Sequence, residues 1–288
     1  MDMQKPGYEL LRWGEEALRN AQITDWKTDA WILYEFVTGQ NRATFLMEAR
    51  HTVVSDYDAE RYEELIGRRC CHVPVQHLTG VQEFMGFSFR VNENVLVPRM
   101  DTEVLVQEVE KYAKPGASVL DMCTGSGCIA ISLKKRNDRL KLSAADCSEK
   151  ALEIARDNCQ RLNAEVHLYC SDLFEQFKQT EQLEQFDMIV SNPPYIPSRV
   201  VDTLAPEVRE HEPRLALDGA GDGLFFYRRI TADSTAFLKK GGMLFYEIGY
   251  DQGAAVQGIM EESGFRNVKI IKDLAGLDRV VYGGIEDV

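Results

Sequence analysis

The sequence has no long apolar run and no excess of basic charge. Of its 288 residues, 33 are Lys or Arg and 46 are Asp or Glu, so the formal net charge at pH 7 is −13. A helix that crosses a bilayer needs roughly 18 or more consecutive apolar residues, and a nucleic-acid surface needs clustered cations. Arg68-Arg69 and Lys239-Lys240 are only pairs. We therefore expect neither membrane insertion nor direct nucleic-acid binding.

Secretion signals and paired metal ligands are also missing. The N-terminal residues lack the apolar stretch and small-residue cleavage site of a signal peptide. Cys70, Cys71, His72 and His77 lie close together, but no Cys-x-x-Cys pair or second ligand pair accompanies them, so no metal site is expected. The seven cysteines are odd in number, which favours reduced thiols. These features predict a cytoplasmic protein.

The pattern along the chain predicts three parts. Residues 1–72 carry apolar residues at helical spacing and predict a small helical bundle. Residues 73–98 combine Gly, Pro and alternating apolar side chains, which predicts a β-hairpin linker. From residue 99 to 288, strand and helix patterns alternate, which is typical of an α/β fold with a doubly wound, mostly parallel, Rossmann-like sheet.

Three helices are expected in the first part. Apolar residues recur at helical spacing from Leu10 to Leu18. Thr28-Asp29 predict the N-cap of a second helix that ends at Gly39, and Ser55 predicts the start of a third.

The later part contains seven candidate strands. They span residues 119–123, 142–146, 166–169, 188–191, 242–248, 268–271 and 279–283. Only residues 272–278 separate the last two, which is too short for a helical crossover, so these strands are expected to be antiparallel.

A glycine-rich loop, Thr124-Gly125-Ser126-Gly127, follows the first candidate strand. Glycines allow a sharp turn and close approach of a ligand, and ligands of such sheets bind at the carboxyl ends of the strands. Asp146 ends the second strand, where a carboxylate accepts hydrogen bonds from ribose hydroxyls. Taken alone, this pattern fits both a nicotinamide dinucleotide and S-adenosylmethionine (SAM).

The third and fourth strands favour SAM. Asp172 could accept from an adenine amino group while Leu173 packs on the ring, a use less typical of nicotinamide enzymes. Asn192-Pro193-Pro194-Tyr195 follow the fourth strand. The prolines stiffen this loop and leave their carbonyls as acceptors. A rigid turn would explain both prolines, but not the Asn before them and the Tyr after them.

The Asn-Pro-Pro-Tyr segment resembles the signature of SAM-dependent methyltransferases that modify planar amide or amine nitrogens. Five blocks in order extend the resemblance: NENVLVPRMDTE, DMCTGSGCIAI, FDMIVSNPPYI, HEPRLALDGAGDGLFFYRRI and DLAGLDRVV. From about residue 73 to 281 the chain is thereby similar to the release factor glutamine methyltransferase family, PrmC/HemK. Its helical N-terminal part also matches the size of that family's recognition domain.

The resemblance implies a site and a reaction. The implied SAM contacts are Thr124, Gly125, Ser126, Gly127, Asp146, Asp172, Leu173 and Asn192. The implied substrate contacts are Asn192, Pro193, Pro194 and Tyr195, of which Asn192, Pro193 and Tyr195 are the implied catalytic residues. The implied reaction methylates N5 of the glutamine in the Gly-Gly-Gln loop of class I peptide chain release factors and leaves S-adenosylhomocysteine. The family also implies a monomer whose residues 1–72 grip the partner and whose residues 99–288 catalyse.

Several alternatives stay open at this level. The same chemistry could act on a ribosomal-protein glutamine or on adenine N6 of a nucleic acid, and a non-catalytic SAM-binding protein is a further reading. A nicotinamide oxidoreductase is disfavoured by the Asn-Pro-Pro-Tyr loop. Cys123, Met100 and His77 depart from the family pattern, which often has Gly, Pro and Tyr there. The HEPRLALDGAGDGL segment fits either a structural loop or a lining of the substrate entrance.

Overall fold

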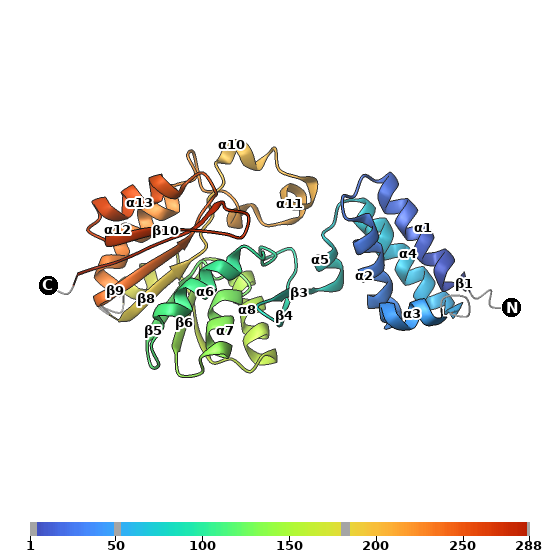
Figure 1. The fold of residues 1–288 in the computed structure, drawn as a ribbon, viewed down its shortest axis with the longest axis horizontal. Coiled ribbons are helices and arrows are strands. Elements are labelled where there is room, and N and C mark those ends of the chain that lie inside the picture. Colours follow the sequence, from blue (N-terminus) through green and yellow to red (C-terminus); the bar gives the residue numbers. More distant parts are fainter. Residues whose placement is uncertain (1–4, 49–52, 180–184, 287–288) are drawn as a thin grey trace. The chain divides into compact units, whose positions relative to one another are not determined.

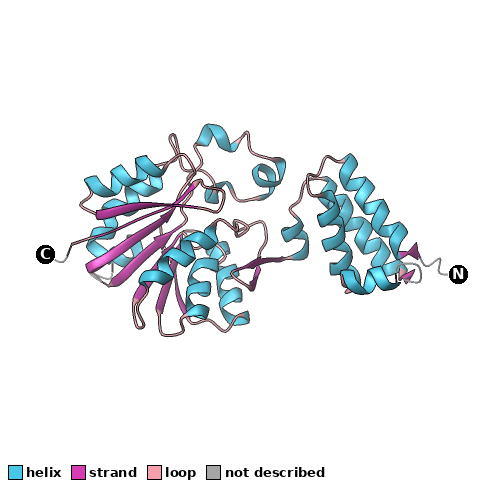
Figure 2. Ribbon diagram, in the orientation of Figure 1, coloured by secondary structure: helices cyan, strands magenta, loops and turns pink. Residues whose placement is uncertain are grey.

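The computed structural model describes residues 5–48, 53–179 and 185–286 (Figures 1 and 2). The chain forms two compact units. The first contains Met1–Val81 together with Ala205–His211, and the second contains Gln82–Leu204 together with Glu212–Val288. Within the described ranges, no helix is long and apolar enough to cross a membrane.

The first unit is a helical bundle. Its helices are α1 (Gly7–Asn20), α2 (Trp26–Thr38), α3 (Arg42–Glu48), α4 (Asp56–Cys70), α5 (Val75–Thr79) and α11 (Pro206–His211). Two short strands, β1 (Lys5–Pro6) and β2 (Val53–Val54), pair antiparallel. The core is built from fully buried side chains that include Leu18, Leu33, Tyr34, Tyr62 and Ile66.

The predicted helical bundle is confirmed, but α3, α5, α11 and the β1–β2 pair were not predicted. Ser55 caps α4 by accepting from the Asp58 N–H, and Gly39 ends α2 with a left-handed backbone, both as expected. The predicted cap at Thr28-Asp29 is wrong, because α2 begins at Trp26 and Asp29 lies buried in its first turn. The Asp29 carboxylate accepts from Arg69 Nε at 2.8 Å, so it forms a buried ion pair instead of capping the helix.

The segment predicted as a β-hairpin linker, residues 73–98, contains the hairpin but begins with a helix that was not predicted. Residues 75–79 form α5, and only then does the antiparallel hairpin β3 (Val81–Phe84) and β4 (Phe87–Arg90) follow. The left-handed Gly80 ends the helix. The hairpin packs its buried Phe84 and Phe89 rings edge to face, at 6.0 Å between centroids, against the core of the second unit.

The second unit contains a seven-stranded sheet. Its strands are β5 (Ser118–Met122), β6 (Lys141–Asp146), β7 (Val166–Cys170), β8 (Phe186–Ser191), β9 (Leu238–Glu247), β10 (Arg266–Lys272) and β11 (Asp278–Gly284). The order is β10-β11-β9-β8-β5-β6-β7. The pairs from β7 to β9 are parallel, whereas β11 is antiparallel to β9 and β10. The Rossmann-like sheet, its seven strands and its antiparallel end are thus confirmed.

Helices cover both faces of this sheet (Figures 1 and 2). One face packs against α6 (Thr102–Tyr112), α7 (Cys128–Arg136) and α8 (Glu149–Arg161), and the other against α12 (Phe225–Phe237) and α13 (Gly253–Glu262). Short helices α9 (Glu175–Gln179) and α10 (Ser198–Val201) and the 3-10 turn Arg214–Ala216 lie in the connections.

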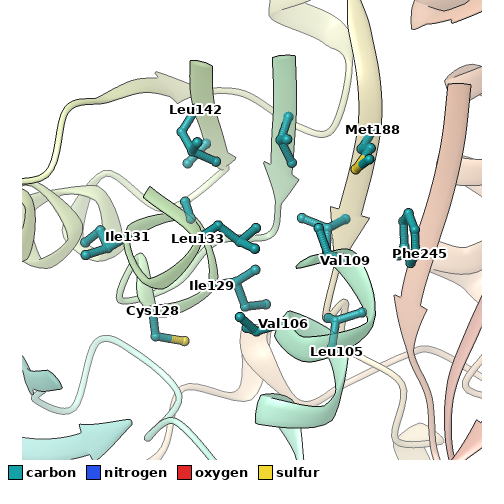
Figure 3. Close-up of a cluster of buried hydrophobic side chains, with 14 of the residues drawn as sticks. Leu105, Val106, Val109, Cys128, Ile129, Ile131, Leu133, Leu142, Met188 and Phe245 are labelled. Carbon is teal, nitrogen blue, oxygen red and sulfur yellow. The ribbon is translucent and has the colours of Figure 1, made fainter. Parts of the chain in front are cut away.

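Alternation along the strands divides the core between the two faces. Val119 and Phe245 pack with α6 and α7, whereas their neighbours Leu120 and Leu244 pack on the opposite face. Figure 3 shows the first face, where α6 and α7 meet Met188 of β8. Because helices pack on both faces of the buried strands, the carboxyl ends of these strands form a rigid edge. The strand order changes direction between β5 and β8, which is where ligands of such sheets bind.

Candidate functional site

A pocket lies at the carboxyl ends of β5, β6, β7 and β8. Most of the predicted cofactor residues line it: Thr124, Gly125, Ser126, Asp146, Asp172, Leu173 and Asn192. Pro194 also lines the pocket, whereas Gly127, Pro193 and Tyr195 do not. Four loops that are distant in sequence therefore meet at one place, at the edge where ligands of such sheets bind.

The glycine-rich loop is shaped by its backbone. Gly127 has φ +81° and precedes α7, and a Cβ there would lie 2.9 Å from Ile131 Cδ1 and 3.3 Å from Ala155 Cβ. Cys123, at a position where the resembled family often has glycine, also has a left-handed φ of +63°. Such a backbone costs a residue with a Cβ about 1–2 kcal/mol. The position of Cys123 therefore favours glycine because of its backbone conformation and not because a small side chain is needed.

Two buried polar side chains hold this loop. Asp121 Oδ2 accepts from Thr124 Oγ1 at 2.6 Å and from the Ala130 N–H at 3.2 Å. Asp121 Oδ1 has no hydrogen-bond partner among the described residues, and burial raises the pKa of this carboxyl to about 7. Asn158 of α8 donates to the Ser126 carbonyl at 2.9 Å and to the Arg90 carbonyl at 3.0 Å. Sequence reasoning assigned a role to neither Asp121 nor Asn158.

Asp146 is fixed by two backbone groups. Its Oδ2 accepts from the Gly125 N–H and its Oδ1 from the Ser148 N–H, both at 2.9 Å. Burial raises the pKa of this carboxyl, and these hydrogen bonds partly offset the effect. Ser148 itself caps α8 by accepting from the Ala151 N–H. Each Asp146 oxygen keeps further acceptor capacity toward a ligand.

The third loop combines a buried and an exposed side chain. Leu173 is buried with a left-handed φ of +51°, and its carbonyl accepts from Ser171 Oγ at 2.6 Å. The Asp172 side chain is 59% exposed and pairs with Arg229 of α12 at 3.0 Å. Arg229 lies 57 residues further along the chain, within one of the five sequence blocks, but sequence reasoning assigned it no role.

The fourth loop places Asn192 beside α6. Asn192 Nδ2 donates to Thr102 Oγ1 at 3.4 Å, and both side chains line the pocket. The preceding Ser191 donates to the Met122 carbonyl at 2.7 Å, which ties the end of β8 to β5. Tyr195 is half-buried, and burial raises the pKa of its phenol, so the phenol is neutral at pH 7.

The segment that follows α11 braces this loop. The Ile196 N–H donates to the Leu217 carbonyl at 3.0 Å, and the Gly219 N–H donates back to the Ile196 carbonyl at 2.8 Å. Gln252 Nε2 donates to the Tyr195 carbonyl at 3.0 Å. Pro213, Leu215 and Ala216 line the pocket. The HEPRLALDGAGDGL segment thus supplies structural support, one of the two readings left open by sequence, and it also lines the pocket. Its role at a substrate entrance stays a prediction.

An ion pair joins two of the sequence blocks. Arg99 Nη2 lies 2.6 Å from Glu212 Oε1, and Glu212 is buried. Burial raises the pKa of the Glu212 carboxyl, whereas Arg99 lowers it. The neighbouring Met100 is 64% exposed, so the absence of proline there leaves no hole in the core. Among the described residues, no group of three or more His, Cys, Asp or Glu could hold a metal ion.

Comparisons with known proteins agree with this architecture. A family model described as PrmC N-terminal domain matches residues 9–80, and one described as methyltransferase small domain matches residues 99–215. A solved T. thermophilus 16S rRNA methyltransferase, in complex with AdoMet and guanosine, shares the fold with a TM-score of 0.52. It is 17% identical and the match covers 72% of this chain and 50% of that chain.

Two relatives are similar along most of their length. The release factor glutamine methyltransferase of Geobacter sulfurreducens is 43% identical over 221 residues, which cover 77% of this chain and 76% of that protein. The protein of the same name from Clostridium acetobutylicum is 40% identical over 257 residues, 88% of this chain and 89% of that protein. The cofactor is SAM. The chain belongs to the release factor glutamine methyltransferase family of SAM-dependent enzymes.

Proposed function

We propose that this protein methylates N5 of the glutamine in the Gly-Gly-Gln loop of class I peptide chain release factors. One observation carries the proposal: Asn192 and Pro194 line the same pocket as Asp146 and the glycine-rich loop. The loop that would bind the substrate amide and the strand ends that would bind the SAM nucleoside therefore line the same pocket. The relatives' names supply the release factor as the substrate.

The reaction needs positioning more than acid–base chemistry. A glutamine amide nitrogen is a poor nucleophile, but its NH₂ group offers two donors. In this proposal the Asn192 side-chain oxygen and the Pro193 carbonyl accept both of them, and Tyr195 packs beside the amide. The C–S bond of SAM breaks as the C–N bond forms, and the nitrogen then loses a proton to water. The acceptor dipoles stabilise the positive charge that develops on nitrogen, and orientation supplies up to about 7–11 kcal/mol.

The proposed cofactor contacts divide among three strand ends. Asp146 accepts from the ribose hydroxyls, and Asp172 accepts from the adenine amino group while Leu173 packs on the ring. Thr124–Gly127 approach the cofactor through their backbone, with Asn192 at the methyl-donor end. The buried Asp121 acts indirectly, because it holds Thr124 and the first turn of α7.

Asp146→Ala is expected to weaken SAM binding by about 1.5–3 kcal/mol, because charge-assisted hydrogen bonds to the ribose are lost. The same change frees the Gly125 N–H, which now donates to Asp146. Isothermal titration of SAM into the purified protein measures the effect. Asp138→Ala, an exposed carboxylate that does not line the pocket, is the matched control. Equal affinities for the Asp146→Ala and wild-type proteins would refute the ribose assignment.

Methyl transfer from radiolabelled SAM to a purified release factor tests the proposed function. A release factor with Gln→Ala in its Gly-Gly-Gln loop is the control, and a ribosomal protein and duplex DNA are the alternative acceptors. Label on the intact release factor alone is the expected result. Label on the ribosomal protein or DNA would support methyl transfer to a planar nitrogen but contradict the release factor as the substrate.

We further propose that the protein acts as a monomer, without direct nucleic-acid contact, and that helical residues 1–72 grip the release factor. The net charge of −13 supports the absence of a general attraction to phosphate. Light scattering of the protein alone measures its oligomeric state, and light scattering with the release factor measures the stoichiometry of the complex.

A further inference from the structure

Gln252 is a buried polar side chain to which the proposed reaction has so far given no role. It lies in the connection that follows β9 and immediately precedes α13, and only 8% of it is exposed. Its Oε1 accepts from the Gly249 N–H at 3.0 Å, and its Nε2 donates to the Tyr195 carbonyl at 3.0 Å and to the Gly223 carbonyl at 3.3 Å. One side-chain amide therefore joins three loops from different parts of the sequence.

These partners fix the orientation of the Gln252 amide. Carbonyl oxygens only accept, so the NH₂ group faces Tyr195 and Gly223, and a backbone N–H only donates, so the amide oxygen faces Gly249. The space is tight, because a Cβ at Gly223 would lie 2.4 Å from the Tyr195 oxygen and 2.7 Å from Gln252 Nε2. The NH₂ group thus holds the Tyr195 carbonyl at a defined place.

The Asn-Pro-Pro-Tyr loop depends on what holds its two ends. Pro193 and Pro194 have no N–H groups, so this stretch cannot be fixed by backbone donors of its own. At its beginning the loop continues from Ser191, the last residue of β8, which is paired within the sheet. At its end the Tyr195 carbonyl accepts from Gln252, 57 residues away along the chain. The position of the Pro193 carbonyl therefore depends on Gln252 as well as on β8.

We propose that Gln252 is a positioning residue for methyl transfer. By holding the Tyr195 carbonyl, its NH₂ group keeps the Pro193 carbonyl where that oxygen accepts from the substrate glutamine. The inference rests on the proposed function, because the Pro193 carbonyl needs a fixed position only if it binds a substrate amide. Gln252 does not line the pocket, so it acts without touching SAM or substrate. A displacement of about 1 Å beside the reacting atoms is enough to lower a rate about 100-fold.

Gln252→Met tests the two donated hydrogen bonds, because it keeps the length of the side chain and removes both donors. We expect the kcat for release factor methylation to fall at least about tenfold at saturating SAM. The Kd for SAM should stay within about twofold, since Asp146 and the glycine-rich loop follow other strands. Gln257→Met, in the same helix, is the matched control. Its Nε2 donates to Glu261 at 2.8 Å at an exposed site, and its kcat should equal that of the wild type.

Gln252→Glu keeps the acceptor toward Gly249 and so isolates the donated bonds from the accepted one. A carboxylate has no donor and a protonated carboxyl has one, so neither form holds both carbonyls. We expect kcat to fall at least about fivefold for this variant too. It also decides the question if Gln252→Met does not fold, which the thermal unfolding curve of each variant shows.

A double variant separates positioning from structural support. Once Asn192→Ala has removed one acceptor, the substrate amide is no longer held in line, and the place of the Pro193 carbonyl matters less. Adding Gln252→Met to Asn192→Ala should therefore lower kcat by less than about threefold. Fully multiplied losses would overturn the inference. A parallel loss of kcat and SAM affinity in Gln252→Met would make Gln252 merely structural.

The outcomes also distinguish this inference from the proposed function. If the wild-type protein labels the release factor and both Gln252 variants do so within about twofold of the same kcat, positioning by Gln252 is wrong and the function stands. If the wild-type protein labels no release factor, the proposed function and the inference fall together.

Discussion

Asn192→Ala is expected to lower the kcat for release factor methylation by at least about 100-fold. The substitution removes the oxygen that holds one amide N–H of the substrate and one of the dipoles that stabilise charge on its nitrogen. It also removes the donor to Thr102. The substrate amide then rotates freely beside the methyl group, so that few encounters place its nitrogen in line with the C–S bond.

Single-turnover methyl transfer at saturating SAM measures this loss without a contribution from product release. SAM affinity should change little, since Thr124, Gly125 and Asp146 still line the pocket. Asn192→Asp is an informative companion: it keeps an acceptor but loses the NH₂ group that donates to Thr102. We expect it to be impaired too. A rate for Asn192→Ala within a few-fold of wild type would refute amide clamping by this side chain.

Local patterns were sufficient to predict the sheet and the loops at its edge. Buried strands such as β5 and β8 are mostly apolar, and the chemistry-bearing residues follow them directly in sequence, as Asn192 follows β8. Because the carboxyl ends of parallel strands share one edge, the four loops could be brought together before their coordinates were known. That reasoning is local and needs only one element at a time.

Residues that reach the site from distant elements could not be found in this way. Arg229 meets Asp172 from α12, and Thr102 meets Asn192 from α6. Both lie within sequence blocks that resemble the family, but nothing local in those blocks indicates which loop each side chain meets. Their roles depend on strand order and helix placement, which a single sequence specifies only through the complete fold.

One residue in each unit shows where residue type misleads. The identity of Cys123 alone gave no sign of its left-handed φ of +63°, which is what makes glycine the easier residue at that position. Asp29 was interpreted as a helix cap because Asp often caps helices. The buried Arg69, 40 residues away, accounts for it instead. In both cases backbone geometry or a distant partner outweighed the local preference.

Gly219→Ala is expected to lower kcat by about 30–100-fold, although Gly219 touches neither cofactor nor substrate in the proposed site. A Cβ at Gly219 would lie 2.8 Å from both the C and Cα atoms of Tyr195, and 2.9 Å from the Gly223 Cα. These are backbone atoms, which cannot turn aside as a side chain does. The residue also donates to the Ile196 carbonyl, so the added methyl pushes directly on the chain that follows Pro194.

Gly221→Ala is the matched control, two residues away in the same loop. A Cβ there meets nothing within 4 Å, and neither glycine has a left-handed φ, so the two substitutions differ in the space available rather than in backbone strain. Gly221→Ala should keep the wild-type kcat, while Gly219→Ala displaces Tyr195 and the amide-binding carbonyl of Pro193. Comparing the kcat and thermal midpoint of both variants tests this. Equal kcat values would mean that the loop yields, and that Asn192–Tyr195 are held by the end of β8 and by Gln252 alone.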